Sequence, residues 1–371
     1  MSTSRKRLGV FTSGGDCPGL NTAIRAIVAH ATLSYGWEVL GILHATQGLL
    51  ERKAIPLNAE GLGGMDVLLN MGGTILGAIN KGDTLAQADD VIAGYHELGL
   101  DALIAICGDG SLKILQQLAQ QGNWNFLAIP KTIDNDVALT DRAIGFDTAV
   151  NIVVDALSRI TSTAASHDRV FVVEVMGRTA GHLALYSGIA GGADVILIPE
   201  IPYSIEGICQ HLQKLRERWG RKFALIVVAE GAHEIGHDPS QPYPPHHSIG
   251  QYIADQVVKQ SPIPIELRVS VLGHIQRGGA PMAMDRLLAA GMGNTAVDLA
   301  AQGTFGRMVA WQGGQVVTVP ISDVVAKCPR HVDPDSFLIR TAQGLGIYVG
   351  DKPMLPYVDP TLCRDEVTCA I

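Results

Sequence analysis

The chain has 371 residues, 47% hydrophobic and 17% charged, so it can bury a large core, and two α/β domains are expected rather than one. A net charge of -8 argues against a nucleic-acid or membrane-surface protein. The six cysteines contain no CxxC pair and are typical of reduced cytosolic thiols, and no apolar run is long enough to span a membrane. We expect a soluble, cytoplasmic protein with no nucleic-acid or membrane partner.

Apolar runs and helix-like runs alternate along the chain. The expected strands occupy residues 8–13, 38–45, 101–107, 125–132, 169–175, 194–200 and 223–231. The expected helices occupy residues 22–33, 112–120, 148–166 and 204–220, and the Pro- and His-rich segment 236–248 is expected to be a surface loop. Several strands are almost continuously apolar, which is typical of parallel strands covered on both faces. The sequence therefore predicts an α/β fold with two doubly wound, mainly parallel-sheet Rossmann-like domains that face each other.

Polar residues that end the strands are the candidate site residues, because open parallel sheets bind ligands beyond the carboxyl ends of their strands. These residues are Gly14, Gly15, Asp16, Gly108, Asp109, Gly110, Ser111, Lys131, Thr132, Asp134, Asp136, Met176, Gly177, Arg178 and Glu230. There is no GxGxxG and no GxxxxGK[ST], so neither a standard dinucleotide site nor a P-loop is indicated.

The segment CGDGS, residues 107–111, joins an expected strand to an expected helix. Glycines let the backbone approach an anion, and a helix N-terminus favours negative charge, so the segment is typical of a phosphate-binding corner. Asp109 would repel a phosphate directly, so we predict that it holds Mg²⁺, which bridges carboxylates to phosphate oxygens. Asp134 and Asp136 are expected to face the same way on an extended segment, where a carboxylate can accept the proton of an attacking hydroxyl.

Each motif has an ordinary alternative when taken alone. Gly-Asp-Gly is common turn chemistry, SGGDCPGLN can be a turn with a helix cap, and TIDND can be a solvated loop. His274 can be a packed core residue and Arg277 a surface cation, and we expect His237, His246 and His247 to be solvated rather than metal-binding. The occurrence of several such motifs in order, each at the end of a strand, favours a functional site.

Seven segments together resemble the phosphofructokinase family: TSGGDCPGLN, GDGS, PKTIDND, GFDTA, VVEVMGRTAGHLAL, AEG and RVSVLGHIQRGGAPMAMDR. The resemblance runs from about Leu8 to Met292 with every motif in order. It implies two facing Rossmann-like sheets with the active site between them. It also implies transfer of a phosphoryl group to the 1-hydroxyl of fructose 6-phosphate, which gives fructose 1,6-bisphosphate in glycolysis.

The resemblance implies roles for individual residues. It makes Asp134 the catalytic base, flanked by Thr132 and Asp136, with Arg178 stabilising the transferred group. It makes Asp109 the magnesium ligand, and it places the phosphates of the nucleotide on Gly15, Gly108, Gly110 and Ser111. The implied contacts to fructose 6-phosphate are Met176, Gly177, Glu230, His274 and Arg277.

Two further sets of residues match family positions at subunit boundaries. Arg169 and Arg268 match arginines that a neighbouring subunit lends to the sugar phosphate, and arginine forks suit a phosphate dianion. The active unit then cannot be a monomer, and the family implies a homotetramer built as a dimer of dimers. Part of an effector site is matched by Arg25, Asp194, Arg221 and Lys222. Ala29 stands where a second arginine is common, which leaves regulation by ADP or phosphoenolpyruvate open.

The phosphoryl donor is indicated by two positions that conflict. Gly110 matches ATP users, because pyrophosphate-using relatives have Asp there, whereas Lys131 matches the pyrophosphate users. We give Gly110 more weight, since a missing side chain is needed to admit the α-phosphate of ATP, while a lysine can also meet its γ-phosphate. Asn80 stands where ATP enzymes carry a bridging arginine, and Lys81 next to it can substitute with lower geometric precision.

The expected function is an ATP-dependent 6-phosphofructokinase that needs Mg²⁺. A pyrophosphate-dependent enzyme is the alternative for the donor, and a catalytically silent sugar-phosphate or nucleotide sensor is the alternative from another class. We expect residues 1–145 with about 276–326 to form the phosphoryl-donor domain, and about 146–275 with 327–371 to form the sugar-phosphate domain. No role is evident for the extension after Lys327.

Overall fold

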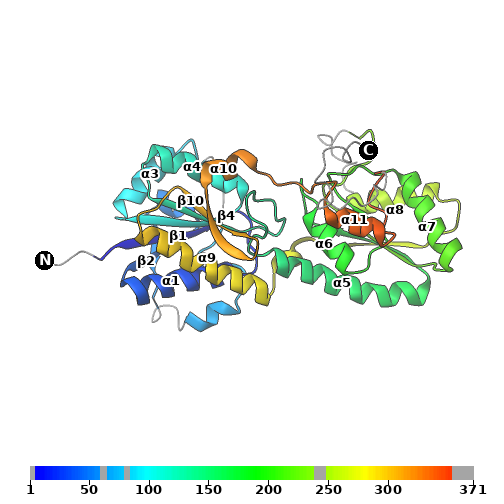
Figure 1. Cartoon of the computed structure of the whole chain (residues 1–371), viewed down its shortest axis with the longest axis horizontal. Coiled ribbons are helices and arrows are strands. Elements are labelled where there is room, and N and C mark those ends of the chain that lie inside the picture. Colours follow the sequence, from blue (N-terminus) through cyan, green and yellow to red (C-terminus); the bar gives the residue numbers. More distant parts are fainter. Residues whose placement is uncertain (1–4, 59–64, 79–83, 238–247, 353–371) are drawn as a thin grey trace, which may run out of the picture.

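The computed structural model describes residues 5–58, 65–78, 84–237 and 248–352. Two β-sheets, each with helices on both faces, lie end to end along the long axis of the molecule (Figure 1). The predicted fold class, α/β with two mainly parallel sheets, is confirmed. Asn80, Lys81, His246, His247 and most of the expected surface loop lie outside the described residues. In the part of the chain that is described, no helix has the length and apolarity to cross a membrane.

The first sheet has seven strands in the order β11-β10-β5-β4-β1-β2-β3. Its strands are β1 (Arg7–Ser13), β2 (Glu38–Ile42), β3 (Ala54–Pro56), β4 (Ala102–Cys107), β5 (Phe126–Pro130), β10 (Arg307–Gln312) and β11 (Gln315–Pro320). The inner five strands run parallel, and the edge strands β3 and β11 pair antiparallel with their neighbours. The parallel strands therefore bring their carboxyl ends to one edge.

Strand β4 shows why the inner strands lack an alternating pattern. Ile104 and Ile106 face a core shared with α1 (Leu20–Tyr35) and α9 (Ala283–Ala301). Leu103 and Ala105 face a second core, shared with α3 (Ala88–Glu97), α4 (Asp109–Gln121) and α10 (Ile321–Lys327). Because both faces are covered by helices, every position of the strand is apolar.

The second sheet has four parallel strands in the order β7-β8-β6-β9. They are β6 (Val170–Val175), β7 (Val195–Leu197), β8 (Ala224–Ala229) and β9 (Leu267–Val271). One face packs on α5 (Phe146–His167), α6 (His182–Ala190) and α11 (Phe337–Gly344). The other face packs on α7 (Ile205–Trp219) and α8 (Ile249–Gln260).

The chain passes between the two halves at three points. Helix α5 leads out of the first half, and the 3₁₀ turn η2 (Gly273–Arg277) joins β9 to α9 on the way back. The segment after α10 then leads across to α11 (Figure 1). Two short elements, α2 (Thr46–Leu50) and η1 (Met65–Leu69), complete the first half.

Candidate active site

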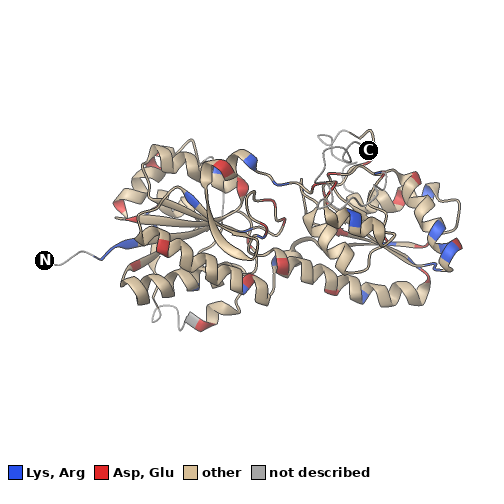
Figure 2. Cartoon of the chain, in the orientation of Figure 1, with Lys and Arg blue, Asp and Glu red and all other residues tan. Residues whose placement is uncertain are grey.

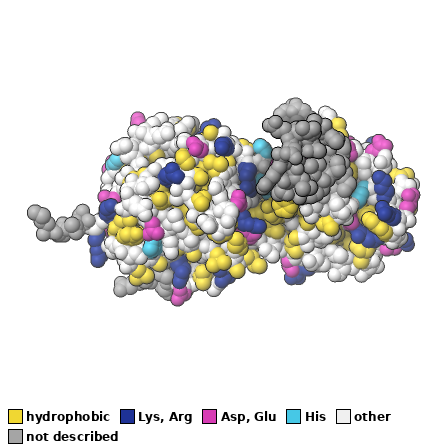
Figure 3. Space-filling model, viewed as in Figure 1, with side chains coloured by type: hydrophobic (Ala, Val, Ile, Leu, Met, Phe, Trp, Pro, Cys, Tyr) yellow, Lys and Arg dark blue, Asp and Glu magenta, His cyan; other side chains and the backbone are white. Residues whose placement is uncertain are grey.

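A cavity of about 530 Å³ opens where the carboxyl ends of the two sheets meet. It is lined by Gly14, Gly15, Gly108, Asp109, Gly110, Ser111, Ile114, Lys131, Thr132, Asp134, Asp136, Arg178, Thr179 and Arg277. The space-filling view shows a furrow between the two halves, with charged side chains of both signs along it (Figure 3). Most of the residues predicted from the ends of strands therefore come together in one place.

The glycine loop after β1 passes close to two cations. Gly14 has a φ of +86°, and a Cβ there would lie 2.8 Å from the Nζ of Lys131. A Cβ on Gly15 would lie 2.3 Å from Nη1 of Arg277, which donates a hydrogen bond to the Asp16 carbonyl at 3.1 Å. The left-handed conformation favours glycine at position 14, and a side chain at position 15 would have to displace the guanidinium of Arg277. Arg277, predicted as a sugar-phosphate contact, therefore also touches the donor-side loop.

The Gly-Asp-Gly corner connects β4 to α4 as predicted. Strand β4 ends at Cys107, Gly108 follows, and Asp109 begins the helix. The free N–H groups of the first helical turn lie at the cavity wall, where they favour an anion. A Cβ added to Gly110 would meet no atom within 4 Å. Open space therefore lies beside Gly110.

Lys131 lies between the two glycine loops. Its side chain is buried, with 3% exposed, and its Nζ lies 3.6 Å from the position of a Cβ on Gly108. Burial lowers the pKa of the ammonium group, because the charged form loses its hydration. An anion bound at the two loops would stabilise the protonated ammonium group of Lys131. Lys131 is therefore suited to bind a polyphosphate.

Asp134 and Asp136 share the cavity, but the segment that carries them is not extended. Asn135 has a φ of +54°, a left-handed conformation that asparagine tolerates. Its buried side chain donates to the Asp141 carbonyl at 3.0 Å and accepts from the N–H of Ala143 at 2.9 Å. The predicted extended segment is therefore wrong, and an internally hydrogen-bonded turn presents both carboxylates instead.

The surroundings of the two carboxylates raise both of their pKa values. Burial, followed by the charge of Asp136, raises the pKa of Asp134 to about 6. Burial and the charge of Asp109 also raise the pKa of Asp136, whereas a hydrogen bond from Thr132 opposes that rise. Among the described residues, Oδ1 of Asp134 and Oδ1 of Asp136 are buried without a hydrogen-bond partner. A carboxylate with a pKa near neutrality and an unused acceptor is suited to take a proton.

Thr132 fixes the start of this turn. Its Oγ1 accepts a hydrogen bond from the Asp134 N–H at 3.1 Å. The backbone N–H of Thr132 in turn donates to the Ile144 carbonyl at 3.1 Å. Thr132 therefore links the acid-bearing turn to the segment that leads into α5.

The loop after β6 brings Arg178 to the opposite wall. Gly177 has a φ of +128°, and its carbonyl accepts from the N–H of Gly231 at 3.3 Å. A Cβ on Gly231 would lie 1.7 Å from the Arg178 carbonyl oxygen, so only glycine fits there. Gly231 belongs to the AEG motif and had no predicted role. Its close backbone approach positions the loop that carries the exposed Arg178 side chain.

Two fully buried polar side chains, Gln276 and Asp285, had no predicted role. Their hydrogen bonds stabilise the loops around the site. The Oε1 of Gln276 in η2 accepts from the N–H of Met176 at 3.2 Å. Asp285 on α9 accepts from the N–H groups of Gly145 and Thr148 at 2.8 Å each, which caps the start of α5. Burial raises the pKa of Asp285 to about 6. Both residues lie within the motif RVSVLGHIQRGGAPMAMDR, and their place in it is the feature of the sequence from which a role could have been predicted.

Three predicted sugar-phosphate contacts lie beside the cavity rather than in its lining. Met176 is half-buried next to η2, and His274 is exposed on η2. Glu230 is exposed, and its negative charge contributes to the raised pKa of Asp134. Glu230 is therefore near Asp134, and the side chains of Glu230 and His274 are open to solvent.

Arg169 and Arg268 lie at the other end of the second sheet. Arg169 precedes β6 and Arg178 follows it, and a strand of six residues spans about 20 Å. Both arginines donate to Oε1 of Glu266, at 2.8 Å and 2.5 Å. One chain by itself does not bring them to the cavity.

The predicted effector residues fall into two separate places. Arg25 on α1 forms an ion pair with Asp66 at 2.9 Å. Arg221 forms an ion pair with Asp194, and Lys222 forms one with Asp168 at 3.3 Å. Basic residues gather at the outer end of the second half, around α7 (Figure 2). A single chain therefore does not join Arg25 to the other three.

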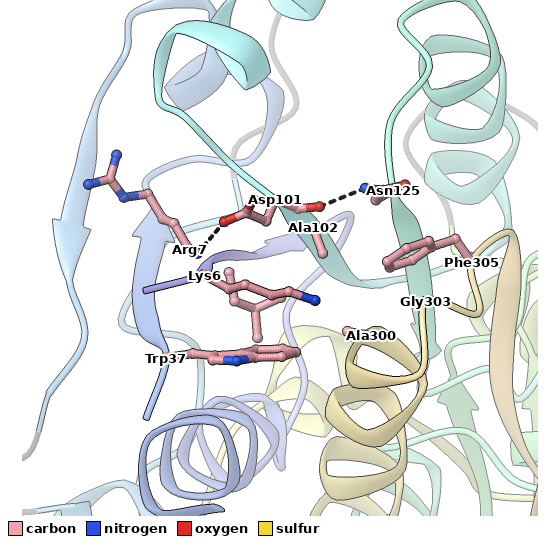
Figure 4. Close-up of a pocket in the computed structure, with 10 residues that line it drawn as sticks. Lys6, Arg7, Trp37, Asp101, Ala102, Asn125, Ala300, Gly303 and Phe305 are labelled. Carbon is pink, nitrogen blue, oxygen red and sulfur yellow. Dashed lines mark hydrogen bonds between the residues drawn. The ribbon is translucent and has the colours of Figure 1, made fainter. Parts of the chain in front are cut away.

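A smaller cavity, of about 130 Å³, lies at the opposite end of the first sheet (Figure 4). Lys6, Trp37 and Phe305 line it, and Nζ of Lys6 lies 5.3 Å from the centroid of the Trp37 ring. None of the predicted site residues is in its lining. The larger cavity is therefore the candidate active site.

Comparison with known proteins identifies the family of the chain. The family model described as phosphofructokinase matches residues 7–300. An ATP-dependent 6-phosphofructokinase of Thermosynechococcus vestitus is 90% identical over 371 residues, which is 100% of both chains. One of Chloroflexus aurantiacus is 46% identical and covers 95% of this chain and 100% of its own.

Solved structures show the same fold. The phosphofructokinase of Pichia pastoris is 32% identical with a TM-score of 0.77, over 88% of this chain and 38% of that chain. This chain thus spans less than half of the yeast chain. The pyrophosphate-dependent phosphofructokinase of Nitrosospira multiformis, 20% identical with a TM-score of 0.80 over 96% and 94% of the two chains, shares the fold. The chain belongs to the phosphofructokinase family.

Proposed function

We propose that the protein is an ATP-dependent 6-phosphofructokinase, which transfers the γ-phosphoryl group of ATP to the 1-hydroxyl of fructose 6-phosphate. One observation carries the proposal: Asp134, whose Oδ1 is buried without a hydrogen-bond partner, lines the same cavity as the glycine corner at Asp109. A sensor would have no use for such a base. The relatives at 90% and 46% identity are named for this activity.

Asp134 acts as the general base in this proposal. Its carboxylate takes the proton of the 1-hydroxyl while the hydroxyl oxygen forms a bond to the γ-phosphorus. The bond from that phosphorus to the bridging oxygen of ADP breaks, and ADP leaves with the electron pair. Asp134 then returns its proton to solvent. Arg178 and Thr132 support the step, Arg178 by placing positive charge at the transferred group.

Mg²⁺ is the proposed cofactor, and the corner at Asp109 fits it. Among the described residues, no cluster of three or more His, Cys, Asp or Glu side chains can enclose a metal ion. Mg²⁺ needs no such cage, because it binds through one or two carboxylates together with substrate phosphates and waters. Asp109 would hold it at the cavity wall. When bound, the ion neutralises phosphate charge.

ATP is the proposed donor because open space lies beside Gly110. The phosphates would then contact the loops of Gly15, Gly108 and Ser111. Pyrophosphate is the second candidate, favoured by the buried Lys131 between these loops. Initial rates of the unmodified protein with ATP and with pyrophosphate, measured side by side, separate the two. A pyrophosphate rate well above the ATP rate would contradict the proposed donor.

We propose that fructose 6-phosphate binds toward the second sheet, at Asp136, Met176, Gly177, Glu230, His274 and Arg277, with Arg169 and Arg268 supplied by a neighbouring subunit. The position of both arginines about 20 Å from the Arg178 end of β6 supports their action in another subunit's site. This arrangement needs at least two subunits, and we propose the homotetramer, built as a dimer of dimers, that the family resemblance implies. The effector roles of Arg25, Asp194, Arg221 and Lys222 stay predictions.

The neighbouring-subunit proposal has a direct test. An Arg268→Ala chain mixed with an Asp134→Ala chain should recover activity in hybrid oligomers, because some sites then combine an intact Asp134 with an intact Arg268. Native mass spectrometry would verify that hybrids form. Hybrids that form without any recovery would show that each site is built within one chain.

We also propose the domain bounds given above, residues 1–145 with about 276–326, and about 146–275 with 327–371. The sheet membership of the strands supports this division, since β1–β5, β10 and β11 form one sheet and β6–β9 the other. Residues 353–371 lie outside the described part of the chain.

The activity itself is tested by a coupled assay with fructose 6-phosphate, ATP and Mg²⁺. Formation of ADP and fructose 1,6-bisphosphate in equal amounts is the expected result. Binding of both ligands without turnover would instead favour the sensor.

A further inference from the structure

The segment between α10 and α11 begins with five residues, Cys328–Val332, that we call the crossover strap. It carries the chain from the first half to the second, seen in orange beside α10 (Figure 1). No role for this part of the extension after Lys327 is evident from the sequence. The strap makes hydrogen bonds to both loops that supply the proposed catalytic side chains, and the contacts of Arg330 are the most numerous.

Arg330 binds the acid-bearing turn through its carbonyl groups. Its Nη1 donates to the Thr140 carbonyl at 2.6 Å, and its Nη2 and Nε donate to the Asn135 carbonyl at 2.9 Å and 3.2 Å. Nη2 also reaches the Asp141 carbonyl at 3.3 Å. The backbone N–H of Arg330 donates to the Asp136 carbonyl at 2.6 Å. One residue thus holds both ends of the turn around Asp134 and Asp136.

This role suits arginine and no other side chain. The turn has no regular secondary structure, and Asn135 at its centre is in a left-handed conformation, so its carbonyls need donors from elsewhere. A planar guanidinium offers five N–H donors in a fixed fork, whereas a lysine ammonium cannot span carbonyls in this way. Among the described residues, no carboxylate forms an ion pair with Arg330, so the carbonyl oxygens are its main partners.

The next two residues of the strap bind the opposite wall. Nδ1 of His331 donates to the Thr179 carbonyl at 2.7 Å, directly beside Arg178. The N–H of Val332 donates to Oε1 of Glu200 at 2.7 Å, and the same carboxylate accepts from the N–H of Gly181 at 3.0 Å. The strap therefore ties the turn of the proposed base to the loop of the proposed phosphoryl-stabilising arginine.

We propose that Arg330 is a positioning residue for phosphoryl transfer: it fixes the turn that presents Asp134, and through the strap it sets that turn relative to the loop of Arg178. This inference rests on the proposed phosphofructokinase activity. A displacement of about 1 Å between reacting groups lowers rates by about 10²-fold, so loss of the carbonyl clamp should act on turnover more than on substrate binding.

The test compares Arg330→Met with Arg307→Met in the full chain. Arg307 is a matched control, because its Nη2 also donates to a backbone carbonyl, that of Thr318 at 2.6 Å, in the β10–β11 pair. We expect kcat of Arg330→Met to fall about 10²-fold while KM for both substrates changes less than about threefold. Arg307→Met should keep kcat. Arg330→Lys should also have a low kcat, because an ammonium group lacks the planar fork of N–H donors.

Chemical rescue separates positioning from general loss of folding. In Arg330→Gly, guanidinium chloride at a few millimolar should restore part of kcat, whereas ammonium chloride at the same concentration should not. A kcat for Arg330→Met within twofold of the unmodified protein, or a loss that guanidinium does not relieve, would overturn the inference. If the unmodified protein itself shows no turnover, the proposed function fails instead, so the two failures are distinct.

The coupling between the two loops has its own measurement. Glu200→Gln weakens the tie from the strap to Gly181 without touching Arg330. In the double variant with Arg330→Met, the losses in kcat should be less than multiplicative, since both substitutions release the same strap. Independent, multiplicative effects would show that the strap does not link the two loops.

Discussion

The two walls of the cavity are built in different ways. The wall from the first sheet carries charged groups that are buried or half-buried: Lys131 is 3% exposed, Asp134 is half-buried, and burial raises the pKa of Asp134. The wall from the second sheet carries the exposed side chain of Arg178, on a loop shaped by close backbone packing, and the exposed Glu230 lies outside the lining. The proposed base, Asp134, is thus preorganised at a desolvation cost, whereas the exposed Arg178 stays hydrated until a ligand binds.

Removal of the proposed base, Asp134, is the strongest test of this contrast. We expect Asp134→Ser to lower kcat by about 10²–10⁴-fold with smaller changes in KM, because proton removal matters in the transition state. Steady-state kinetics with both substrates varied will measure the effect. If KM for fructose 6-phosphate rises while kcat is kept, Asp134 only binds the sugar.

The open space beside Gly110 gives the next largest expected effect. A carboxylate introduced by Gly110→Asp would meet the phosphates of the donor, and like charges brought together cost several kcal/mol, so kcat/KM for ATP should fall by about 10²-fold or more. Gly110→Ala is the matched control, because a Cβ there meets no atom of the protein within 4 Å. Equal losses in both variants would mean that crowding and not charge is responsible.

The pH dependence of kcat/KM tests whether burial raises the pKa of the proposed base, Asp134. The pKa of Asp134 is raised to about 6, and the base must be ionised to act. Because protonation removes the active form, kcat/KM should fall about tenfold per pH unit below about pH 6. A profile that stays flat down to pH 5 would contradict Asp134 as the base.

The sequence was most informative where a buried parallel strand ends in a short glycine or acid motif. Strand β4 and the corner at Asp109 follow from local pattern alone, since an apolar run, a glycine and a helix-like run are adjacent in the chain. The left-handed turn at Asn135 and the clamp by Arg330 do not, because they depend on carbonyl contacts between segments far apart in sequence. The antiparallel edge strand β11 was also missed, because it is only partly buried and lacks a continuous apolar run.

The buried ammonium group of Lys131 gives a smaller expected effect, on binding of the phosphoryl donor. Lys131→Met keeps the length of the side chain in its buried site but removes the ammonium group. We expect KM for the donor to rise about tenfold, the size of one lost hydrogen bond to a charged group, with little change in KM for fructose 6-phosphate. Mg²⁺ at Asp109 would still neutralise phosphate charge, which keeps the effect below that of Gly110→Asp. A larger loss with pyrophosphate than with ATP would identify Lys131 as the residue that selects the donor.

The smallest expected effect is on stability, and it follows from the same buried acid. The pKa of Asp134 in the folded protein, about 6, lies above its ordinary value of 3.8, so the folded state binds the proton more tightly than the unfolded chain does. The stability from this difference is present at low pH and is lost as the pH rises through 6. At pH 8 the ionised side chain therefore destabilises the fold, by at most about 3 kcal/mol at 1.36 kcal/mol per pKa unit.

Asp134→Asn removes the charge and should raise Tm at pH 8 by a few degrees, with a difference that shrinks toward pH 5. Asp255→Asn is the matched control, since Asp255 is exposed on α8 and its carboxylate is hydrated in both states. Differential scanning calorimetry at the two pH values will measure both variants. A Tm for Asp134→Asn that is lower at pH 8 than that of the unmodified protein would mean that the carboxylate stabilises the turn. The reactivity proposed for Asp134, on the wall from the first sheet, would then have a cause other than desolvation.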